Sequence, residues 1–384
     1  MATNSKSIDH KSIVEALLNS DTTNNNSLYP FSSKLDVIIN VHPCDDSVST
    51  RDYSITNISL NGHFKNEKTD DSYQIRDLDT MLYTYITEIN EQIQNDSRQW
   101  NAFYVLKELI QKIEEFHFHH ESPHHSILNK YDLFYRGQNH NYPMLPGIAR
   151  TNSVDTNRIS ENFESIYENL SYEYPELKYI SFPFSLDTDN SKEHIRDRVT
   201  QLALLQHYGF PTPLVDVTSS PFVGMFFMAH EFNSEEKYYN NNESPVLSIF
   251  LSQKGELNSL FQRAEVTPTN HRLKPQFGSF IDFEMLTLQN FDVTPPKAHA
   301  INITFEYDRT NHKNMLSKKS IRIPPTNSIN FSNLMKKMFD SIRCDIDNKL
   351  GEYHYRYIDL FPDLENRASY IKNKYKPDNK DLSI

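Results

Sequence analysis

Residues 205–221 read LQHYGFPTPLVDVTSSP, and they place the end of one helix, a strand and the start of another helix within a short stretch of chain. The helix predicted over residues 194–208 must end there, because Gly209 readily adopts the C-terminal capping conformation and Pro211 cannot continue a helix. Residues 214–217 then predict a strand. The chain is therefore expected to pass from helix to sheet at this point.

The second helix of this stretch begins at a favourable pair of residues. Ser220 can cap free backbone N–H groups, and Pro221 is tolerated at the first helical position. Residues 221–230 are apolar nearly all round, which is typical of a buried helix. The free N–H groups at its start also suit an anion.

Polar side chains gather at the breaks between these elements, and binding sites are commonly built at such strand ends. They are Gln206, His207, Thr212, Asp216 and Thr218. Two interpretations stay open. The side chains bind a ligand, or Gln206 and His207 cap a helix end while Asp216 and Thr218 brace a turn.

Outward from this stretch, predicted helices and strands follow one another in mixed order. Strands are predicted at residues 35–41, 53–60, 133–135, 246–251, 301–307 and 321–323, and helices at residues 81–93, 101–116, 158–170, 331–342 and 364–374. This order favours an α+β fold with a mixed sheet surrounded by helices. We expect residues 1–99 to form a small accessory N-terminal region, partly disordered and loosely ordered up to residue 34, and residues 100–384 to form the main domain.

Charge and cysteine content narrow the class of protein. The 384 residues carry a formal net charge of −12 without a basic run, so we do not expect duplex nucleic-acid binding. Cys44 and Cys344 are too few for a disulfide framework and lack metal spacing, which favours the cytoplasm. No stretch approaches the ~20 apolar residues of a membrane span, and the N-terminus has no signal-peptide pattern.

Glycine is rare, with eight in the chain, and it is unevenly placed. A sequence that otherwise avoids glycine keeps it where the backbone turns sharply or passes close to another group. Four of the eight fall inside three short segments, and a fifth, Gly224, lies just after the second of them; the four are Gly137, Gly147, Gly209 and Gly278. These segments are therefore the first places to look for a site.

The first segment presents an arginine at the end of an apolar strand. Arg136 is followed at once by Gly137, which places a guanidinium beside exposed backbone and suits bidentate binding of a phosphate or carboxylate. Tyr135, Gln138 and Arg150 are candidate binding residues beside it. The alternative is a structural arginine paired to a buried acid or carbonyl.

The third segment, residues 271–280, is predicted to be a loop. Arg272 and Gln276 flank a proline there and lead into a glycine turn. Elsewhere, five histidines crowd one stretch: His117, His119, His120, His124 and His125. Clustered histidines can bind Zn²⁺, but this spacing fits no standard site, so we interpret the stretch as a solvated loop and predict no metal.

Together these segments resemble the FRG domain, a family named after a Phe/Tyr-Arg-Gly motif. The matching elements are Tyr135-Arg136-Gly137, Gln206 to Thr212 with Leu214, Asp216 and Thr218, the apolar helix Phe222 to Ala229, Arg272 with Gln276, Gly278 and Phe280, and Leu360 to Leu364. The resemblance covers roughly residues 100–375. Two positions depart from the pattern: Pro213 stands where an arginine is usual, and Val217 where a tryptophan is usual. The first departure puts in doubt any contact that the arginine would make.

The resemblance implies a bacterial protein of a mostly uncharacterised family, associated with prophages and defence regions, and hence a toxin or phage-defence effector. The motif order is also similar to ADP-ribosyltransferases, which hold NAD with an arginine and hydroxyls and use a later glutamate at the reacting ribose. That likeness implies NAD as a possible substrate and no certain cofactor. A carboxylate there stabilises the positive charge that develops on the sugar.

Each candidate residue takes a role from this likeness. Arg136 would anchor phosphate or ribose, Thr218 and Ser219 would support the nicotinamide side, His207 and Asp216 would orient them, and Gln276 or Glu284 would act near the sugar. The other candidates for substrate binding are Tyr135, Gly137, Gln138, Arg150, Gln206, Thr212 and Arg272.

Two further functions stay open beside an enzyme. The same pocket can serve a binding module that senses a nucleotide or phage component without chemistry, or the protein can be a scaffold. A carboxylate facing Arg136 would favour the enzyme, and Gln276 alone would favour the sensor. The expected partners are a small-molecule nucleotide or a protein target, without a membrane.

Overall fold

The computed structural model describes residues 8–18, 31–44, 51–62, 72–95, 100–119, 131–150, 154–183, 189–230, 244–253, 259–267, 269–291, 298–308, 329–363, 368 and 371–372. The described strands are β1 (Phe31–Pro43), β2 (Tyr53–Asn61), β3 (Tyr131–Gln138), β4 (Leu214–Thr218), β5 (Val246–Gln253), β6 (Phe261–Gln262), β7 (Gly278–Asp282) and β8 (Ala298–Tyr307). They form one sheet in the order β2-β1-β8-β5-β3-β4-β7-β6. β1 and β8 run parallel, and the other neighbours run antiparallel.

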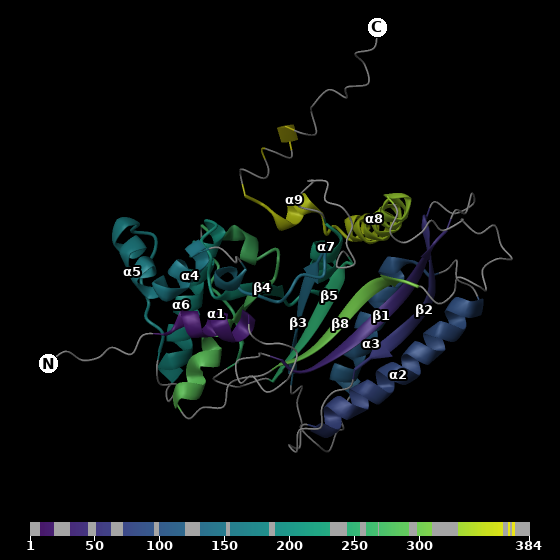
Figure 1. The fold of residues 1–384 in the computed structure, drawn as a ribbon, viewed down its shortest axis with the longest axis horizontal. Helices are drawn as coiled ribbons and strands as arrows, with labels where there is room; N and C mark the ends of the chain where they lie inside the picture. The colour runs from purple at the N-terminus through teal and green to yellow at the C-terminus, as the bar shows by residue number, and fades with distance from the viewer. Residues whose placement is uncertain are drawn as a thin grey trace, which may run out of the picture.

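Helices surround this mixed sheet, so the predicted α+β class is confirmed (Figure 1). They are α1 (His10–Leu18), α2 (Ser72–Asn95), α3 (Ala102–His119), α4 (Val154–Glu161), α5 (Phe163–Glu173), α6 (Asp189–His207), α7 (Pro221–Ala229), α8 (Ile329–Glu352) and α9 (Tyr357–Leu360), with 3₁₀ turns η1 (Gly147–Ala149), η2 (His271–Leu273) and η3 (Phe283–Phe291). Helices α1, α4, α5 and α6 gather at one end of the molecule, and α2, α3 and α8 at the other. Among the described residues, no helix combines the length and apolarity that a bilayer crossing requires.

The two faces of the sheet carry separate hydrophobic cores. Strand β1 turns Leu35, Val37 and Ile39 into one core with α2, α3, α7 and α8. The second core collects the side chains of α1, α5 and α6 with the opposite face of the central strands. Because successive strand residues point to opposite faces, β3 serves both cores: Tyr135 enters the first and Phe134 the second.

The N-terminal region is more ordered than expected. The structure forms α1 within the stretch predicted to be loose, and its Ile13, Val14 and Leu17 are buried. A nine-residue helix gives too short a pattern to be distinguished from a polar loop. Residues 1–7 and 19–30 lie outside the described residues.

Residues predicted to be accessory also complete the main sheet. Strand β1 pairs along its length with β8, and β2 pairs with β1. The domain boundary at residue 100 stays a prediction, although strands from both sides of it share this one sheet. The predicted strand at 321–323, most of the predicted helix at 364–374 and the histidine cluster from residue 117 lie outside the described residues or side chains.

The helix predicted over residues 158–170 is interrupted. Asn162 separates α4 from α5 with a non-helical backbone (φ −118°, ψ 16°), and its Nδ2 donates to the carbonyl of Arg158 at 2.9 Å. Asparagine competes in this way for backbone groups that a continuous helix would use. The prediction of one continuous helix is therefore wrong, because its residues are divided between α4 and α5.

The sheet is weakest between β3 and β4. Strand β3 pairs with β5 over its whole length, but it pairs with β4 only through Tyr135 and Thr218. The loops and helix ends around this point come from distant parts of the chain. The parting of the two strands leaves room for the site described next.

Candidate functional site

A cavity of about 330 Å³ lies where β3 and β4 part. Its walls come from β3, β4, the start of β7, the end of α6, the turn after η2, and Phe227 and Phe361. The sequence-predicted residues that line it are Tyr135, Arg136, Gly137, Gln206, His207, Asp216, Thr218, Arg272 and Gln276. Segments far apart in the chain thus place their polar side chains in one hollow.

Arg136 is the central cation of this cavity. Its Nη1 donates to the backbone carbonyl of Asp216 at 2.5 Å, and its Nε is buried without a hydrogen-bond partner. Burial lowers the pKa of Arg136 to about 10, an effect that Asp216 opposes and Arg150 reinforces. The guanidinium therefore stays charged at neutral pH and keeps donor capacity for an anion, which binds best to two parallel N–H groups.

The Asp216 carboxylate is held by a glutamine whose orientation is itself fixed. Gln206 Nε2 donates to both carboxylate oxygens, at 2.8 and 2.9 Å. Thr212 Oγ1 donates to Gln206 Oε1 at 2.6 Å, so the amide must present its NH₂ group to Asp216. Thr212 is buried and does not line the cavity; it acts on Asp216 through Gln206.

Thr218 and Ser219 join β4 to the turn after η2. Thr218 Oγ1 donates to the carbonyl of Gln276 at 2.7 Å, and the N–H of Ser219 donates to the carbonyl of Phe277 at 3.1 Å. Gln276 Nε2 in turn donates to the carbonyl of Leu360 at 3.0 Å. The side chains of Thr218 and Gln276 and the backbone N–H of Ser219 therefore hold this wall of the cavity together. Ser219 is exposed and is not among the lining residues.

Arg272 ties the same wall to the C-terminal segment. Its Nε pairs with Asp363 Oδ2 at 2.5 Å, and its guanidinium lies 5.5 Å from the centroid of the Phe361 ring. Burial, with Arg272 nearby, lowers the pKa of His207, while Asp363 opposes the shift. The imidazole is therefore neutral at pH 7 and can accept a proton.

The structure requires a glycine at position 137 for a different reason from the one expected. A Cβ added there would lie 1.8 Å from the carbonyl oxygen of Gly224 and 2.4 Å from the nitrogen of Met228. A Cβ on Gly224 would lie 2.9 Å from the Cβ of Tyr135. The glycine lets β3 touch α7, so the backbone expected to be exposed is covered on that side.

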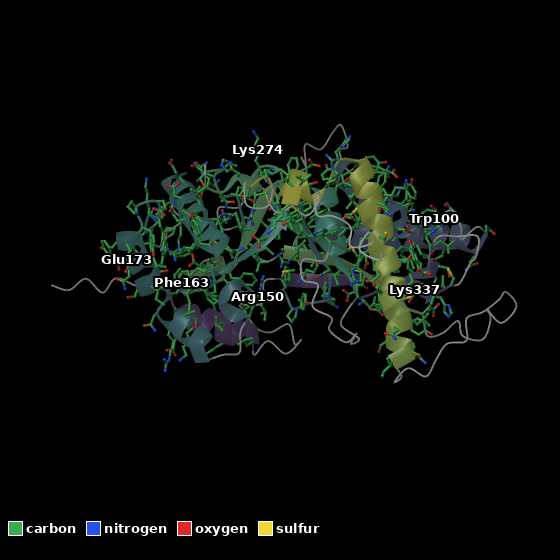
Figure 2. All side chains as sticks on the ribbon, turned by 90° about the horizontal axis from the view of Figure 1, so that it is seen from above. Trp100, Arg150, Phe163, Glu173, Lys274 and Lys337 are labelled. Carbon is green, nitrogen blue, oxygen red and sulfur yellow. The ribbon has the colours of Figure 1, made fainter. Side chains whose placement is uncertain are left out.

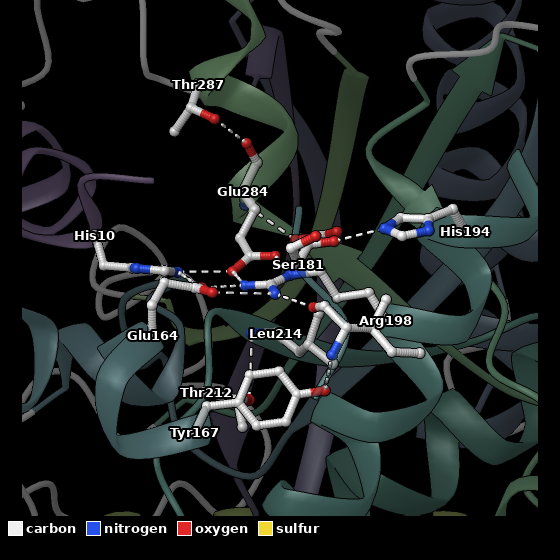
Figure 3. A network of polar contacts seen from close by, with 12 residues as sticks. His10, Glu164, Tyr167, Ser181, His194, Arg198, Thr212, Leu214, Glu284 and Thr287 are labelled. Carbon is white, nitrogen blue, oxygen red and sulfur yellow. Dashed lines mark hydrogen bonds and ion pairs between the residues drawn. The ribbon is translucent and has the colours of Figure 1, made fainter. Parts of the chain in front are cut away.

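Glu284 lies apart from the cavity, in a buried ionic cluster (Figure 3). Arg198 binds it with Nε and Nη2, both at 2.7 Å, and also binds Glu164. His10 Nε2 lies 2.6 Å from Glu284 Oε1. Although burial opposes its ionisation, Arg198 and His10 lower the pKa of Glu284 to about 2. Its position does not support the expected role near a sugar in the cavity.

The same cluster could bring three metal ligands together. Ligand atoms of His10, Glu164 and Glu284 lie within 4.8 Å of one another. The Arg198 guanidinium, however, pairs with both glutamates and already supplies the positive charge. The sequence did contain a signal for this arginine, since Arg198 lies on the apolar stripe of Ile195, Val199 and Leu202.

The remaining candidates lie outside the cavity. Arg150, labelled in Figure 2, is exposed, and its Nε donates to the carbonyl of Leu145 at 2.8 Å. Gln138 lines a different cavity. Sequence reasoning missed Phe227, Asn270 and Phe361 among the lining residues, since only tertiary packing brings them to the site.

Comparison with known proteins identifies one domain. The family model of the FRG domain matches residues 131–237, which hold Arg136, Gln206, His207, Asp216 and Thr218. No curated protein and no solved structure matches the chain. The family match covers the first and second motif segments, whereas Arg272 with Gln276 and the element from Leu360 to Leu364 lie beyond it. The chain therefore contains an FRG domain over residues 131–237, and this domain supplies β3, α6, β4 and α7 to the cavity.

Proposed function

We propose that the cavity binds a nucleotide through a phosphate at Arg136, and that the protein uses NAD or a related nucleotide as substrate. The observation that carries this proposal is the state of Arg136: it lines the cavity, keeps its charge, and leaves Nε unpartnered. A volume of about 330 Å³ falls within the range of ligand pockets and suits one part of a dinucleotide.

Asp216 supports the chemical step. Cleavage of the bond between the ribose C1′ and nicotinamide leaves positive charge on the sugar while nicotinamide departs with the bonding electrons. The Asp216 carboxylate stabilises that charge. Water, or a protein side chain in a transfer reaction, then forms the new bond to C1′ and gives its proton to neutral His207. Asp216 replaces Gln276 and Glu284 in this role, because it presents a carboxylate to the cavity.

The test is release of nicotinamide from NAD. We expect Asp216→Asn to lower the rate about 10²–10³-fold, as losing one transition-state contact does in other enzymes. Arg136→Lys keeps the charge but loses the bidentate geometry, so we expect weaker substrate binding. The control is Arg196→Lys, which changes an exposed arginine paired with Glu265 outside the cavity. Equal rates for wild type and Asp216→Asn would overturn the catalytic assignment.

A second candidate, a non-catalytic sensor, has its own supporting observation. Gln206 already engages both oxygens of Asp216, and the Gln276 side chain is bound to Leu360. Calorimetry with ADP-ribose separates the two functions. Binding that Arg136→Lys weakens, without any nicotinamide release, supports the sensor. A wild-type protein that neither binds ADP-ribose nor consumes NAD contradicts both. A cellular role as a toxin or phage-defence effector is part of this proposal on family resemblance alone.

A further inference from the structure

A second cavity, of about 450 Å³, lies over strands β5 and β8. Its walls come from the end of α1, the start of β1 and the segment that follows β3. None of its lining residues belongs to the Arg136 cavity. Its volume is that of a pocket for a small organic molecule.

Two buried aromatic side chains are among the residues that line this second cavity. Phe31 and Phe250 line it with their rings stacked, 5.3 Å between centroids and 17° between planes. Ala300 is buried beside them, and Tyr142 stands at the rim with 57% of its surface exposed. Aromatic and small apolar side chains of this kind favour a planar ring that stacks on them.

Lys34, the charged residue in the lining of the cavity, is paired with an aspartate. Asp36 Oδ1 lies 3.2 Å from Lys34 Nζ and accepts a hydrogen bond from Asn302 Nδ2 at 3.0 Å. Ser248 Oγ donates to Asn302 Oδ1 at 2.7 Å. Because Asp36 already pairs with the lysine, an anion in the cavity would compete with that carboxylate. An uncharged ligand fits it better.

Two amide side chains in the lining of the cavity can hydrogen-bond to a ligand. In the part of the chain that the structure describes, the side chains of Gln138 and Asn141 have no hydrogen-bond partner, and both line the cavity. Each amide offers one donor and one acceptor side by side, which matches the adjacent donor and acceptor at the edge of a purine. We propose that this second cavity binds an uncharged purine base or nucleoside, stacked over Phe31 and read by Gln138 and Asn141.

This site does not depend on the nucleotide proposed for the Arg136 cavity. Strand β3 nevertheless positions both, since Arg136 and Gln138 are two residues apart and point to the same face of the sheet. The two sites can be told apart by their charge preference. A phosphate should strengthen binding at Arg136 and should add little beside Lys34, which already pairs with Asp36.

The experiment is titration calorimetry with adenosine, guanosine and adenosine monophosphate. We expect a purine nucleoside to bind wild type, and Gln138→Leu and Asn141→Leu each to weaken binding by about tenfold or more, the cost of one unpaired hydrogen-bonding group. The matched control is Asn348→Leu, an exposed amide on α8 outside both cavities, which should bind as wild type does.

Three results would overturn the proposal. They are no binding of either nucleoside at millimolar concentration, unchanged binding by the double variant Gln138→Leu and Asn141→Leu, and binding of adenosine monophosphate through these two residues more than about tenfold tighter than adenosine. Should the half-buried Gln138 prove necessary for folding, the exposed Asn141→Leu and Tyr142→Ala variants carry the test. Thermal melting of each variant verifies the fold.

Discussion

Arg136 lines the cavity and Arg198 lies in the buried ionic cluster, so the two arginines have contrasting surroundings. Arg198 is 1% exposed and donates to Glu284, Glu164 and the carbonyl of Ile180. Although burial disfavours its charge, Glu284 and Glu164 raise the pKa of Arg198 above its ordinary value. Among the described residues, the guanidinium of Arg136 has one hydrogen-bond partner, the carbonyl of Asp216, and burial lowers its pKa to about 10.

The difference separates a structural cation from a binding cation. The acceptors around Arg198 leave no donor capacity for a ligand, whereas Arg136 keeps Nε unused. Perturbed pKa values occur in both kinds of site, so the shift alone does not distinguish them. The number of hydrogen-bond acceptors around the guanidinium does distinguish them, and four predictions test this comparison.

The largest effect is expected for Arg198→Met. Removing one partner of a buried ion pair leaves uncompensated charge on Glu284 and costs about 3–5 kcal/mol of unfolding free energy. The matched variant Arg136→Met loses one hydrogen bond and relieves a desolvated charge, so we expect a cost of about 1 kcal/mol or less. Urea denaturation measures both. Similar losses for the two arginines would remove the distinction between them.

Acid should destabilise the wild-type ionic cluster. The folded chain holds the pKa of Glu284 near 2, below its ordinary 4.5, so the unfolded chain binds the proton first as pH falls. The stabilisation is present above pH 4.5 and is lost, by about 3 kcal/mol, as pH falls toward 2. Thermal melting of wild type and Glu284→Gln across this range measures the difference. If the melting temperatures of both proteins fell in parallel with pH, protonation of Glu284 would not be the cause of the acid destabilisation.

Gly137→Ala probes the neighbour of Arg136. The added Cβ would meet backbone atoms of α7, and such overpacking costs about 1–3 kcal/mol. The control is Gly351→Ala near the end of α8, where a Cβ meets nothing within 4 Å and alanine favours the helix by up to about 1 kcal/mol. The midpoint of chemical denaturation should therefore fall for Gly137→Ala and rise for Gly351→Ala.

The smallest effect is a gain in stability for Asp282→Asn. Burial raises the pKa of Asp282 well above 3.8, and Glu284 adds to the shift. The folded chain retains this proton after the unfolded chain has lost it, so the carboxyl costs stability as pH rises above 3.8. We expect the variant to melt at a higher temperature than wild type at pH 7 and at the same temperature near pH 3. A loss of melting temperature at pH 7 would contradict this prediction.

Local signals predicted the junction of α6, β4 and α7 well. Gly209 ends α6, with φ +84°, and Ser220 Oγ accepts the N–H of Val223 at the start of α7. Such capping depends on a few neighbouring residues, so it can be read from a sequence. Strand β7 was predicted as a loop, because its buried residues 279–282 show no alternation and its partner β4 lies far away in the chain.

The candidate site was predictable to the extent that its residues end local elements. Arg136 and Asp216 belong to strands whose ends meet, and the motifs marked both. The direction of a side chain was not predictable in the same way. Gln276 points to the carbonyl of Leu360, and Glu284 points into the second core, because contacts with distant residues decide each orientation.

The contact between Gly137 and Gly224 restricts how related sequences can diverge. Each glycine leaves no room for a side chain on the other element, so neither can be exchanged by itself without pushing β3 away from α7. That separation would also shift Arg136, which adjoins Gly137 on the strand. Relatives that keep the cavity should therefore conserve the two glycines as a pair, and relatives that lose one should show compensating changes in the strand, the helix or both.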